Sequence, residues 1–338
     1  MNLLEAFQYV HAGGELTREQ SREVFTAALT EQPDTAQLAG FLVALANRRE
    51  SMPEVLGAAE ALRSQARPFE HSFEDAIDTC GTGGDGLGSF NLSTASALVA
   101  ASAGARVIKH GNRSVSSSCG SADLLEACGI VLELSPEAAR TVLEDVGITY
   151  LHAPYYHPSM AFAGPVRRSL GVRTIFNLLG PLANPGRVRR QVLGIADSSR
   201  MDDYAQILEH LGHARALVVH GAGGADELTL EPGNQTQSVG DMPAFGLEPQ
   251  SLGLERAPVS ALAGGDAQAN LGLLHKLLDG DGGPLRDALL YNTAAALVVA
   301  GVAADALEGV RRAAEAIDSG LAKARLAQWV ALTQAVTQ

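Results

Sequence analysis

Hydrophobic spacing in residues 1–72 predicts helices and no strand. Leu3, Phe7 and Val10 recur at helical intervals near the start of the chain. Further on, a residue that can cap a helix stands three positions before Glu or Gln, which is typical of a helix start. This pattern occurs at Thr17, Asp34 and Ser51. These signals predict a small all-helical domain.

A different pattern begins near residue 73, where short apolar runs of strand type alternate with helical patterns. The expected strands are 76–78, 106–109, 149–152, 192–195 and 217–220, and helical patterns at 95–103, 122–127 and 135–146 lie between several of them. Parallel strands need crossover connections, which helices usually provide. The predicted fold class is therefore α/β: a small all-helical domain plus a larger α/β domain, 73–338, with a mostly parallel central sheet flanked by helices.

Two later stretches depart from the alternation. Helical periodicity at 160–170 is followed by a loop that Pro181 and Pro185 make rigid. The sequence Glu-Pro-Gly-Asn at 231–234 is typical of a hairpin turn between the apolar segments 228–230 and 236–239. The end of the chain predicts helices at 269–278, 285–300, 304–320 and 321–336.

The segment after the first expected strand is rich in glycine. Residues 78–85 are Asp-Thr-Cys-Gly-Thr-Gly-Gly-Asp, and glycine lets a ligand approach the backbone closely. Asn91, Ser93 and Thr94 are expected to supply cap and hydroxyl groups where the next helix begins. Free amides at a helix start favour an anion, usually phosphate. The pattern is neither G-x-G-x-x-G nor a P-loop, so for this loop alone an ordinary turn is the alternative.

Cations follow the second expected strand. Lys109 and Arg113 flank a glycine, and their natural partner would be phosphate or pyrophosphate. The alternative is a pair of surface cations. His110 between them could act as an acid or base, but a structural role is the preferred interpretation.

Adjacent carboxylates, Asp226 and Glu227, follow the expected strand 217–220 and a loop that contains glycine. Such a pair suits Mg²⁺, which usually takes one or two carboxylates, several waters and phosphate oxygens. An isolated Asp-Glu pair is more often a solvated acidic turn. Ligands of parallel sheets bind at the carboxyl ends of strands, and the glycine loop is expected at the same edge, which favours the metal.

Composition and charge limit the functional classes to which this protein can belong. The chain has 338 residues, of which 46% are hydrophobic and 19% charged, as in a globular protein with a sizeable core. Its net charge of −13 argues against broad nucleic-acid binding. The three cysteines, Cys80, Cys119 and Cys128, lack metal spacing, and packed thiols are commoner than nucleophiles. The cysteine content fits a reduced, cytoplasmic setting, and neither a membrane helix nor a leader is expected.

In their order, these motifs resemble the anthranilate phosphoribosyltransferase family over nearly the whole chain. The most specific pieces are CGTGGD at 80–85, KHGNR at 109–113 and NLLGPLANP at 177–185. The resemblance implies Mg²⁺-dependent transfer of the phosphoribosyl group of phosphoribosyl pyrophosphate to the amine of anthranilate. The products would be N-(5-phosphoribosyl)anthranilate and pyrophosphate, in tryptophan biosynthesis. It also implies that 159–185 return to the helical domain of 1–72, and that this domain forms a homodimer.

The resemblance also implies a set of site residues. Phosphoribosyl pyrophosphate would be held by Gly81, Gly84, Asp85, Ser89, Asn91, Leu92, Ser93, Thr94, Lys109, His110, Gly111, Asn112, Arg113, Ser114, Val115, Ser116, Ser117 and Ser121. Anthranilate would contact Gly81, Asn112 and Arg167, and up to two Mg²⁺ ions would be held by Ser93, Asp226 and Glu227. An Arg167-Arg168 pair is otherwise typical of a solvated helix face, and only the matching pattern at 166–185 distinguishes Arg167.

The residues fit the implied reaction. As pyrophosphate leaves, the ribose carbon becomes cation-like, so catalysis depends on stabilising the departing charge and holding the nucleophile in line. This stabilisation is expected from Lys109, Asp226 and Glu227, and no residue is assigned as catalytic acid or base. The rivals are a pyrimidine nucleoside phosphorylase and a nucleic-acid-binding relative without transferase activity. The Asp226-Glu227 pair and the NLLGPLANP segment at 177–185 argue against the first, and the negative net charge argues against the second.

Overall fold

The computed structural model describes residues 1–31, 33–114, 118–246 and 248–337. It divides into two compact units, Met1–Pro68 with Ala153–Pro185, and Phe69–His152 with Gly186–Gln338. In these described ranges, no helix has the length and apolar character needed to cross a lipid bilayer.

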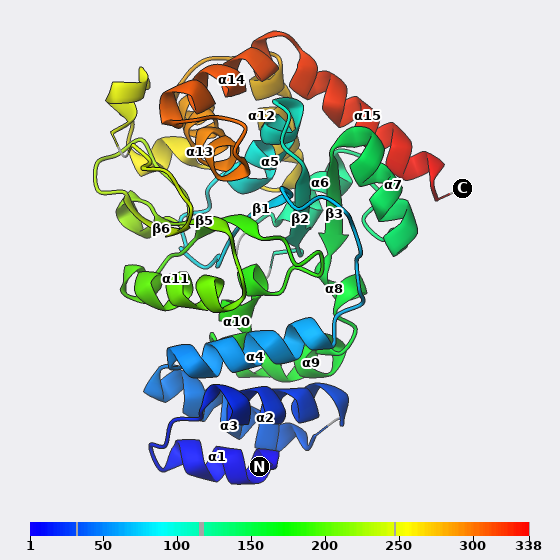
Figure 1. Ribbon diagram of the computed structural model, residues 1–338, viewed down its shortest axis with the longest axis vertical. Helices are drawn as coiled ribbons and strands as arrows, with labels where there is room; N and C mark the ends of the chain where they lie inside the picture. Colours follow the sequence, from blue (N-terminus) through cyan, green and yellow to red (C-terminus); the bar gives the residue numbers. More distant parts are fainter. Residues whose placement is uncertain (32, 115–117, 247, 338) are drawn as a thin grey trace. The chain divides into compact units, whose positions relative to one another are not determined.

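The first unit is helical (Figure 1). Its elements are α1 (Leu3–His11), α2 (Arg18–Thr30), α3 (Thr35–Arg48), α4 (Met52–Ser64), α8 (Ala153–Tyr156), α9 (Met160–Leu170), α10 (Ile175–Leu179) and the 3-10 helix η1 (Gly180–Leu182). The Thr17 hydroxyl accepts a hydrogen bond from the Gln20 amide, as the capping pattern predicts. Phe25 of α2 packs against Phe41 of α3 and Phe176 of α10, with ring centroids 5.5 and 5.9 Å apart. Segments far apart in the chain therefore share one core.

The second unit contains the sheet, whose described residues form six strands in the order β3-β2-β1-β4-β5-β6. The strands are β1 (Ile77–Gly81), β2 (Val107–Gly111), β3 (Ile148–His152), β4 (Arg190–Gly194), β5 (Arg215–His220) and β6 (Gln235–Gly240). β1 to β5 are parallel, and β6 is antiparallel to β5. The predicted fold class, with its mostly parallel sheet, is confirmed.

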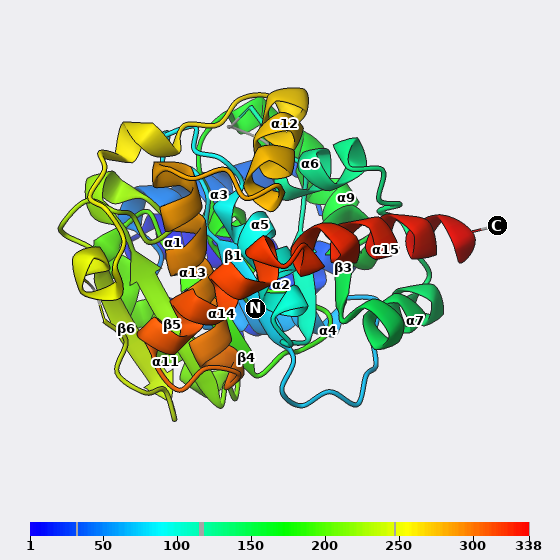
Figure 2. The same ribbon diagram turned by 90° about the horizontal axis from the view of Figure 1, so that it is seen from above.

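Helices cover the two faces of this sheet (Figures 1 and 2). The helices of this unit are α5 (Leu92–Ser102), α6 (Ser121–Ala127), α7 (Pro136–Val146), α11 (Met201–His210), α12 (Ala267–Leu278), α13 (Pro284–Ala300), α14 (Ala306–Asp318) and α15 (Leu321–Ala335), with short 3-10 helices η2 (Ser198–Arg200), η3 (Ala222–Gly224), η4 (Pro249–Leu252) and η5 (Val259–Leu262). α5 packs on β1 and β2, α13 packs on β4 and β5 beside α5, and α11 packs on β5 and β6. The long helix α13 is buried over most of its length because small alanine side chains let neighbouring helices approach closely.

The predicted hairpin around 231–234 is wrong. Residues 228–230 form no strand, and β6 pairs with β5 instead. The reason is that the Asn234 side chain forms hydrogen bonds with the backbone of Thr229. It accepts from the Thr229 N–H and donates to the Thr229 carbonyl oxygen, each at 2.9 Å. The groups that a hairpin partner would use are already bonded, and β6 covers the edge of β5.

Candidate active site

The carboxyl ends of the parallel strands lie at one edge of the sheet. The strands end there at Gly81, Gly111, His152, Gly194 and His220. The glycine loop follows β1, the KHGNR segment spans the end of β2, and the loop that carries Asp226 and Glu227 follows β5. Parallel strands place the loops that follow them at the same edge of the sheet. The structure therefore brings the predicted phosphate-binding segments and the predicted metal-binding segment to one edge.

The acidic segment, Asp226 and Glu227, lies against three glycines at or directly after the ends of β1, β4 and β5. We name these glycines, Gly81, Gly194 and Gly221, the glycine shelf. Gly81 and Gly194 are register partners in β1 and β4. A Cβ atom at Gly81 would collide with the Asp226 carboxylate, at Gly194 with the Asp226 carbonyl, and at Gly221 with the Glu227 carbonyl. The backbone of the acidic segment therefore approaches the strand ends more closely than any side chain would allow.

Backbone amides orient the two carboxylates. The Gly83 amide donates to Asp226 Oδ2 at 2.7 Å, and the Ser93 amide, in the first turn of α5, donates to Glu227 Oε1 at 3.1 Å. Burial raises the pKa of Asp226 to about 6, and the neighbouring Asp85 carboxylate contributes to the increase. Loss of water and the nearby Asp226 raise the pKa of Glu227 well above its ordinary value. Both carboxylates are therefore short of compensating positive charge.

The donor set fits a hard cation. Glu227 Oε2 is buried and has no hydrogen-bond partner within the described residues. Within the same residues, no cluster of three or more His, Cys, Asp or Glu side chains could hold a metal ion. The pair Asp226 and Glu227 suits Mg²⁺, which completes its shell with waters and substrate phosphate oxygens.

Lys109 supplies the nearby positive charge from inside the sheet. It is only 2% exposed, and its Nζ donates to the Thr79 carbonyl oxygen. The Thr79 hydroxyl in turn donates to the Ser93 carbonyl oxygen at 2.9 Å. Lys109 is thus a buried cation beneath the start of α5 and not a surface cation, as the alternative interpretation proposed.

The glycine loop has the backbone conformations that glycine provides. Gly83 and Gly84 have φ angles of 63° and 76°, in the left-handed region. The Asp85 carboxylate accepts from the Leu87 amide at 3.1 Å. Ser89 forms a β-bridge with Ala263, which ties the end of the loop to a distant segment.

The start of α5 differs in one respect from the prediction. Asn91 stands at the cap position, but its side chain makes no capping bond. Its Oδ1 accepts from Asn270 at 2.8 Å, and its Nδ2 donates to the Cys119 carbonyl oxygen at 3.0 Å. Leu92 and Thr94 are buried behind it, and the Thr94 hydroxyl has no hydrogen-bond partner in the described part of the chain.

The segment after β2 is held by one carboxylate. Asp123 Oδ2 accepts from the amides of Ser114 and Gly120 at 3.1 and 2.8 Å. Asp123 Oδ1 accepts from Arg113, whose guanidinium also donates two hydrogen bonds to Glu126 at 2.8 Å. Arg113 is therefore paired with carboxylates in this structure. Three residues that were predicted to bind phosphoribosyl pyrophosphate lie outside the described residues: Val115, Ser116 and Ser117.

The neighbours of β2 complete this part of the edge. The Ser121 hydroxyl lies 3.0 Å from the Tyr150 hydroxyl and donates to the Asn112 carbonyl oxygen at 3.3 Å. Gly111 is required beside them, because a Cβ atom there would collide with Ser121 Oγ. His110 is buried, and its amide lies 3.4 Å from Asp78 Oδ1.

Comparison with known proteins identifies the family. Residues 5–66 match the model of the glycosyl transferase family, helical bundle domain, and residues 73–323 match that of the glycosyl transferase family, a/b domain. The anthranilate phosphoribosyltransferase of Chloroflexus aggregans is 46% identical over 340 residues, which cover 99% of each chain. The chain belongs to the anthranilate phosphoribosyltransferase family. The predicted resemblance is therefore confirmed.

Solved structures of anthranilate phosphoribosyltransferases agree. The enzyme of Thermus thermophilus is 44% identical and superposes with a TM-score of 0.91, covering 97% of this chain and 99% of that one. The enzyme of Saccharomyces cerevisiae is 25% identical with a TM-score of 0.89, covering 98% of each chain, in a complex with phosphoribosyl pyrophosphate and Mg. A further structure of the yeast enzyme contains 4-fluoroanthranilate.

Arg167 of α9 belongs to the helical unit. Its guanidinium lies 5.7 Å from the centre of the Phe176 ring, and burial lowers its pKa. Arg168, the next residue, is exposed. The pattern that relates the chain to the anthranilate phosphoribosyltransferases thus singles out the arginine that the fold holds against an aromatic ring.

A nucleophilic cysteine finds no support. Loss of water and the Asp78 carboxylate raise the pKa of the Cys80 thiol, and the Gln191 amide donates to its sulfur at 3.0 Å. Burial likewise raises the pKa of Cys119 and Cys128. Thiols of this kind remain protonated and are poor nucleophiles.

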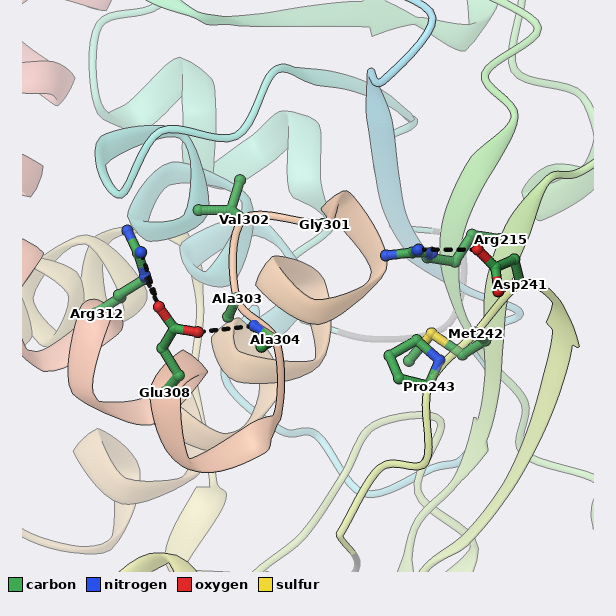
Figure 3. A pocket seen from close by; sticks show the side chains of 10 residues that line it. All are labelled: Arg215, Asp241, Met242, Pro243, Gly301, Val302, Ala303, Ala304, Glu308 and Arg312. Carbon is green, nitrogen blue, oxygen red and sulfur yellow. Dashed lines mark hydrogen bonds and ion pairs between the residues drawn. The ribbon is translucent and has the colours of Figure 1, made fainter.

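A pocket of about 530 Å³ lies at the other edge of the sheet, beside the start of β5 (Figure 3). Arg215 and Arg312 line it, and each is paired with a carboxylate, Asp241 at 3.5 Å and Glu308 at 2.8 Å. Both arginines are therefore paired with carboxylates, and none of the predicted site residues lines this pocket.

Two residues that hold loops of the site in place were not predicted from the sequence. Asn270 and Asn292 are buried amides within apolar helices, and each bonds a loop of the site. One signal was available, because a polar residue on a buried helix face must have hydrogen-bond partners. Which loop each amide would bond depends on the tertiary structure.

Proposed function

We propose that the chain catalyses the reaction of its family, the transfer of a phosphoribosyl group from phosphoribosyl pyrophosphate to the amine of anthranilate. The products would be N-(5-phosphoribosyl)anthranilate and pyrophosphate, in tryptophan biosynthesis. The observation that carries the proposal is the pairing of Asp226 with the Gly83 amide and of Glu227 with the Ser93 amide. It places two carboxylates beside a glycine loop and a helix start, which together suit a metal-bound pyrophosphate.

The donor site would be formed by the glycine loop, the start of α5 and the segment after β2. The amides of a helix N-terminus favour the negative pyrophosphate group. Lys109 adds a positive charge that is fixed within the sheet. Because Lys109 is buried and bonded to the Thr79 carbonyl oxygen, it would act on the departing charge through the local field, without large rearrangement.

Asp226 and Glu227, with Ser93, would hold Mg²⁺. The buried Glu227 Oε2 and the closeness of the two carboxylates support this assignment. Bound Mg²⁺ would offset the charge that develops on the leaving pyrophosphate. The yeast relative that was solved with phosphoribosyl pyrophosphate and Mg supports the use of this ion.

Arg167 would bind the carboxylate of anthranilate, because a guanidinium can donate two parallel hydrogen bonds to a carboxylate. Gly81 and Asn112 would be the other contacts. The amine of anthranilate is neutral near pH 7, so the reaction requires no strong base. This agrees with His110 in a structural position, where its backbone amide lies near the buried Asp78.

Omission of one substrate at a time tests the proposal. The purified protein would be mixed with anthranilate, phosphoribosyl pyrophosphate and Mg²⁺, and the loss of anthranilate fluorescence followed. Loss that requires all three components supports the transferase. Absence of loss, together with phosphate-dependent cleavage of thymidine or uridine, would replace it with a nucleoside phosphorylase.

We also propose that residues 1–72 and 159–185 act as one functional domain and the rest of 73–338 as the phosphoribosyl pyrophosphate-binding domain. The two matched family models support this division. A homodimer through the helical domain is proposed because Leu4, Tyr9 and Val43 are 42%, 45% and 42% exposed on α1 and α3. Light scattering would test it, and the mass of a single chain would contradict it. Three free cysteines support a reducing, cytoplasmic location.

A further inference from the structure

The segment directly after the two carboxylates is buried without belonging to a strand. Leu228, Thr229 and Leu230 are 0%, 0% and 1% exposed, and the structure assigns them to no strand or helix. Buried backbone N–H and carbonyl groups need hydrogen-bond partners, which a strand would find in a neighbouring strand. Here the partners must come from elsewhere.

Asparagine side chains supply them at two consecutive residues. Asn292 of α13 accepts from the Leu228 amide at 3.0 Å and donates to the Leu228 carbonyl oxygen at 2.8 Å. Asn234 does the same at Thr229, with both distances at 2.9 Å. Each amide thus replaces the pair of hydrogen bonds that a neighbouring strand would make.

Both amides are themselves held in one orientation. Asn292 Nδ2 also donates to the Ala288 carbonyl oxygen at 2.9 Å, so its nitrogen and oxygen cannot exchange places without losing bonds. Asn234 Oδ1 also accepts from the Thr229 hydroxyl at 3.2 Å. We name these two residues, Asn292 and Asn234, the asparagine clamps.

The glycine shelf and the clamps act on adjoining stretches of the backbone, the shelf at Asp226 and Glu227 and the clamps directly after them. The shelf fits the carbonyl groups of Asp226 and Glu227, and the first clamp bonds the next residue, Leu228. One peptide bond therefore separates Glu227 from a clamped backbone. The direction of its side chain is set by backbone atoms that cannot shift freely.

We propose that Asn292 and Asn234 are positioning residues for the metal site: they fix the backbone at Leu228 and Thr229 and so hold the Asp226 and Glu227 carboxylates for Mg²⁺. The inference rests on the proposed function. Neither asparagine needs to touch the ion. Groups that orient metal ligands typically contribute a 10-fold to 100-fold effect on metal affinity, about the size expected here.

The test measures metal binding directly. Mn²⁺ replaces Mg²⁺, and the free Mn²⁺ signal is followed by electron paramagnetic resonance in the full-length protein, without pyrophosphate, which would itself chelate the ion. Asn292→Ala and Asn234→Ala are each expected to raise the Kd for Mn²⁺ about 10-fold or more. The matched control is Tyr291→Phe, which removes a partly buried hydrogen bond of the neighbouring residue in the same helix, from the Tyr291 hydroxyl to the Gly246 carbonyl oxygen at 3.0 Å. It is expected to lower Tm without changing the Kd.

Wild-type Kd values in both folded asparagine variants would overturn the inference. So would an equal weakening in Tyr291→Phe, because general loosening of the core would then explain the effect. If Asn292→Ala does not fold, Asn234→Ala decides, since Asn234 lies in a loop outside the helices. Anthranilate consumption by the wild-type protein tests the proposed function separately. An active wild type with unchanged variants would remove only the role of the clamps.

Discussion

Ser93 and Glu227 are 134 residues apart in the chain, yet the Ser93 amide donates a hydrogen bond to Glu227 Oε1 at 3.1 Å. The bond joins the first turn of α5 to the acidic segment. On the other side of the same turn, the Ser93 carbonyl oxygen accepts from the Thr79 hydroxyl. A carboxylate at a helix N-terminus is favoured by the helix dipole. Hydrogen bonds therefore connect the first turn of α5 directly to the proposed metal ligands.

The paired variant Asp226→Asn with Glu227→Gln is expected to lower turnover by about 100-fold or more, because the metal would lose its charged ligands. The fold should be retained, since burial disfavours the charged form of both carboxylates and the amides keep nearly the same shape. Steady-state kinetics across a range of Mg²⁺ concentrations would measure the loss, with circular dichroism as the check on folding. Near-normal turnover at limiting Mg²⁺ would remove the metal assignment.

Gly194→Ala is expected to displace the acidic segment, since the new Cβ atom would meet the backbone carbonyl of Asp226. Overpacking of this kind costs about 1–3 kcal/mol of stability. The matched control is Gly272→Ala, at an open helical position with nothing within 4 Å. There alanine should stabilise by about 1 kcal/mol. Urea unfolding of both variants checks the prediction, and equal behaviour would show that the shelf needs no glycine.

Asp123→Ala is expected to raise the KM for phosphoribosyl pyrophosphate about 10-fold, because the amides of Ser114 and Gly120 would lose a shared charged acceptor. The KM for anthranilate should change less. Glu126→Ala serves as the control, since it removes only the ion pair with Arg113. If the two variants gave the same kinetics, the role of Asp123 in ordering this segment would be lost.

Arg167→Ala is expected to raise the KM for anthranilate by about 10-fold or more, since hydrogen bonds between charged groups contribute about 1.5–3 kcal/mol. Arg168→Ala, in the exposed neighbouring position, should leave it nearly unchanged. Kinetics at saturating phosphoribosyl pyrophosphate would separate the two. An unchanged KM in Arg167→Ala would contradict its assignment.

His157 is expected to make the stability of the fold depend on pH. Burial lowers its pKa from 6.5 to about 4. The neutral ring therefore contributes stability that is fully present above pH 6.5 and is lost as the pH falls through about 4. The loss amounts to about 3 kcal/mol. His157→Gln should show a flatter dependence of the free energy of unfolding between these pH values, and an equally steep one would rule the assignment out.

Local signals explain what could be predicted from the sequence. The cap at Thr17 and Gln20 involves residues three positions apart, and each strand of the parallel sheet carries its own apolar run. The placement of the loops at one sheet edge followed from the alternation of strands and helices. The fold class was therefore accessible without a structure.

Long-range contacts explain what could not. Gly194 fits the Asp226 carbonyl only because β4 lies beside β1, which no local pattern shows. The Asn91 side chain leaves its cap because Asn270, 179 residues away, donates to it. The expected hairpin failed because Asn234 bonds Thr229 and not a strand. In each case the structure depends on a contact with a side chain or strand that the local sequence pattern does not show.

The most direct test compares two quantities in one reaction: anthranilate consumed and pyrophosphate released, with and without Mg²⁺. We expect the two quantities to rise in a one-to-one ratio in the wild-type protein. We also expect both to fall together when the metal is chelated or when Asp226 and Glu227 are replaced. Pyrophosphate release without loss of anthranilate, or consumption of anthranilate that persists without metal, would contradict the proposed transfer.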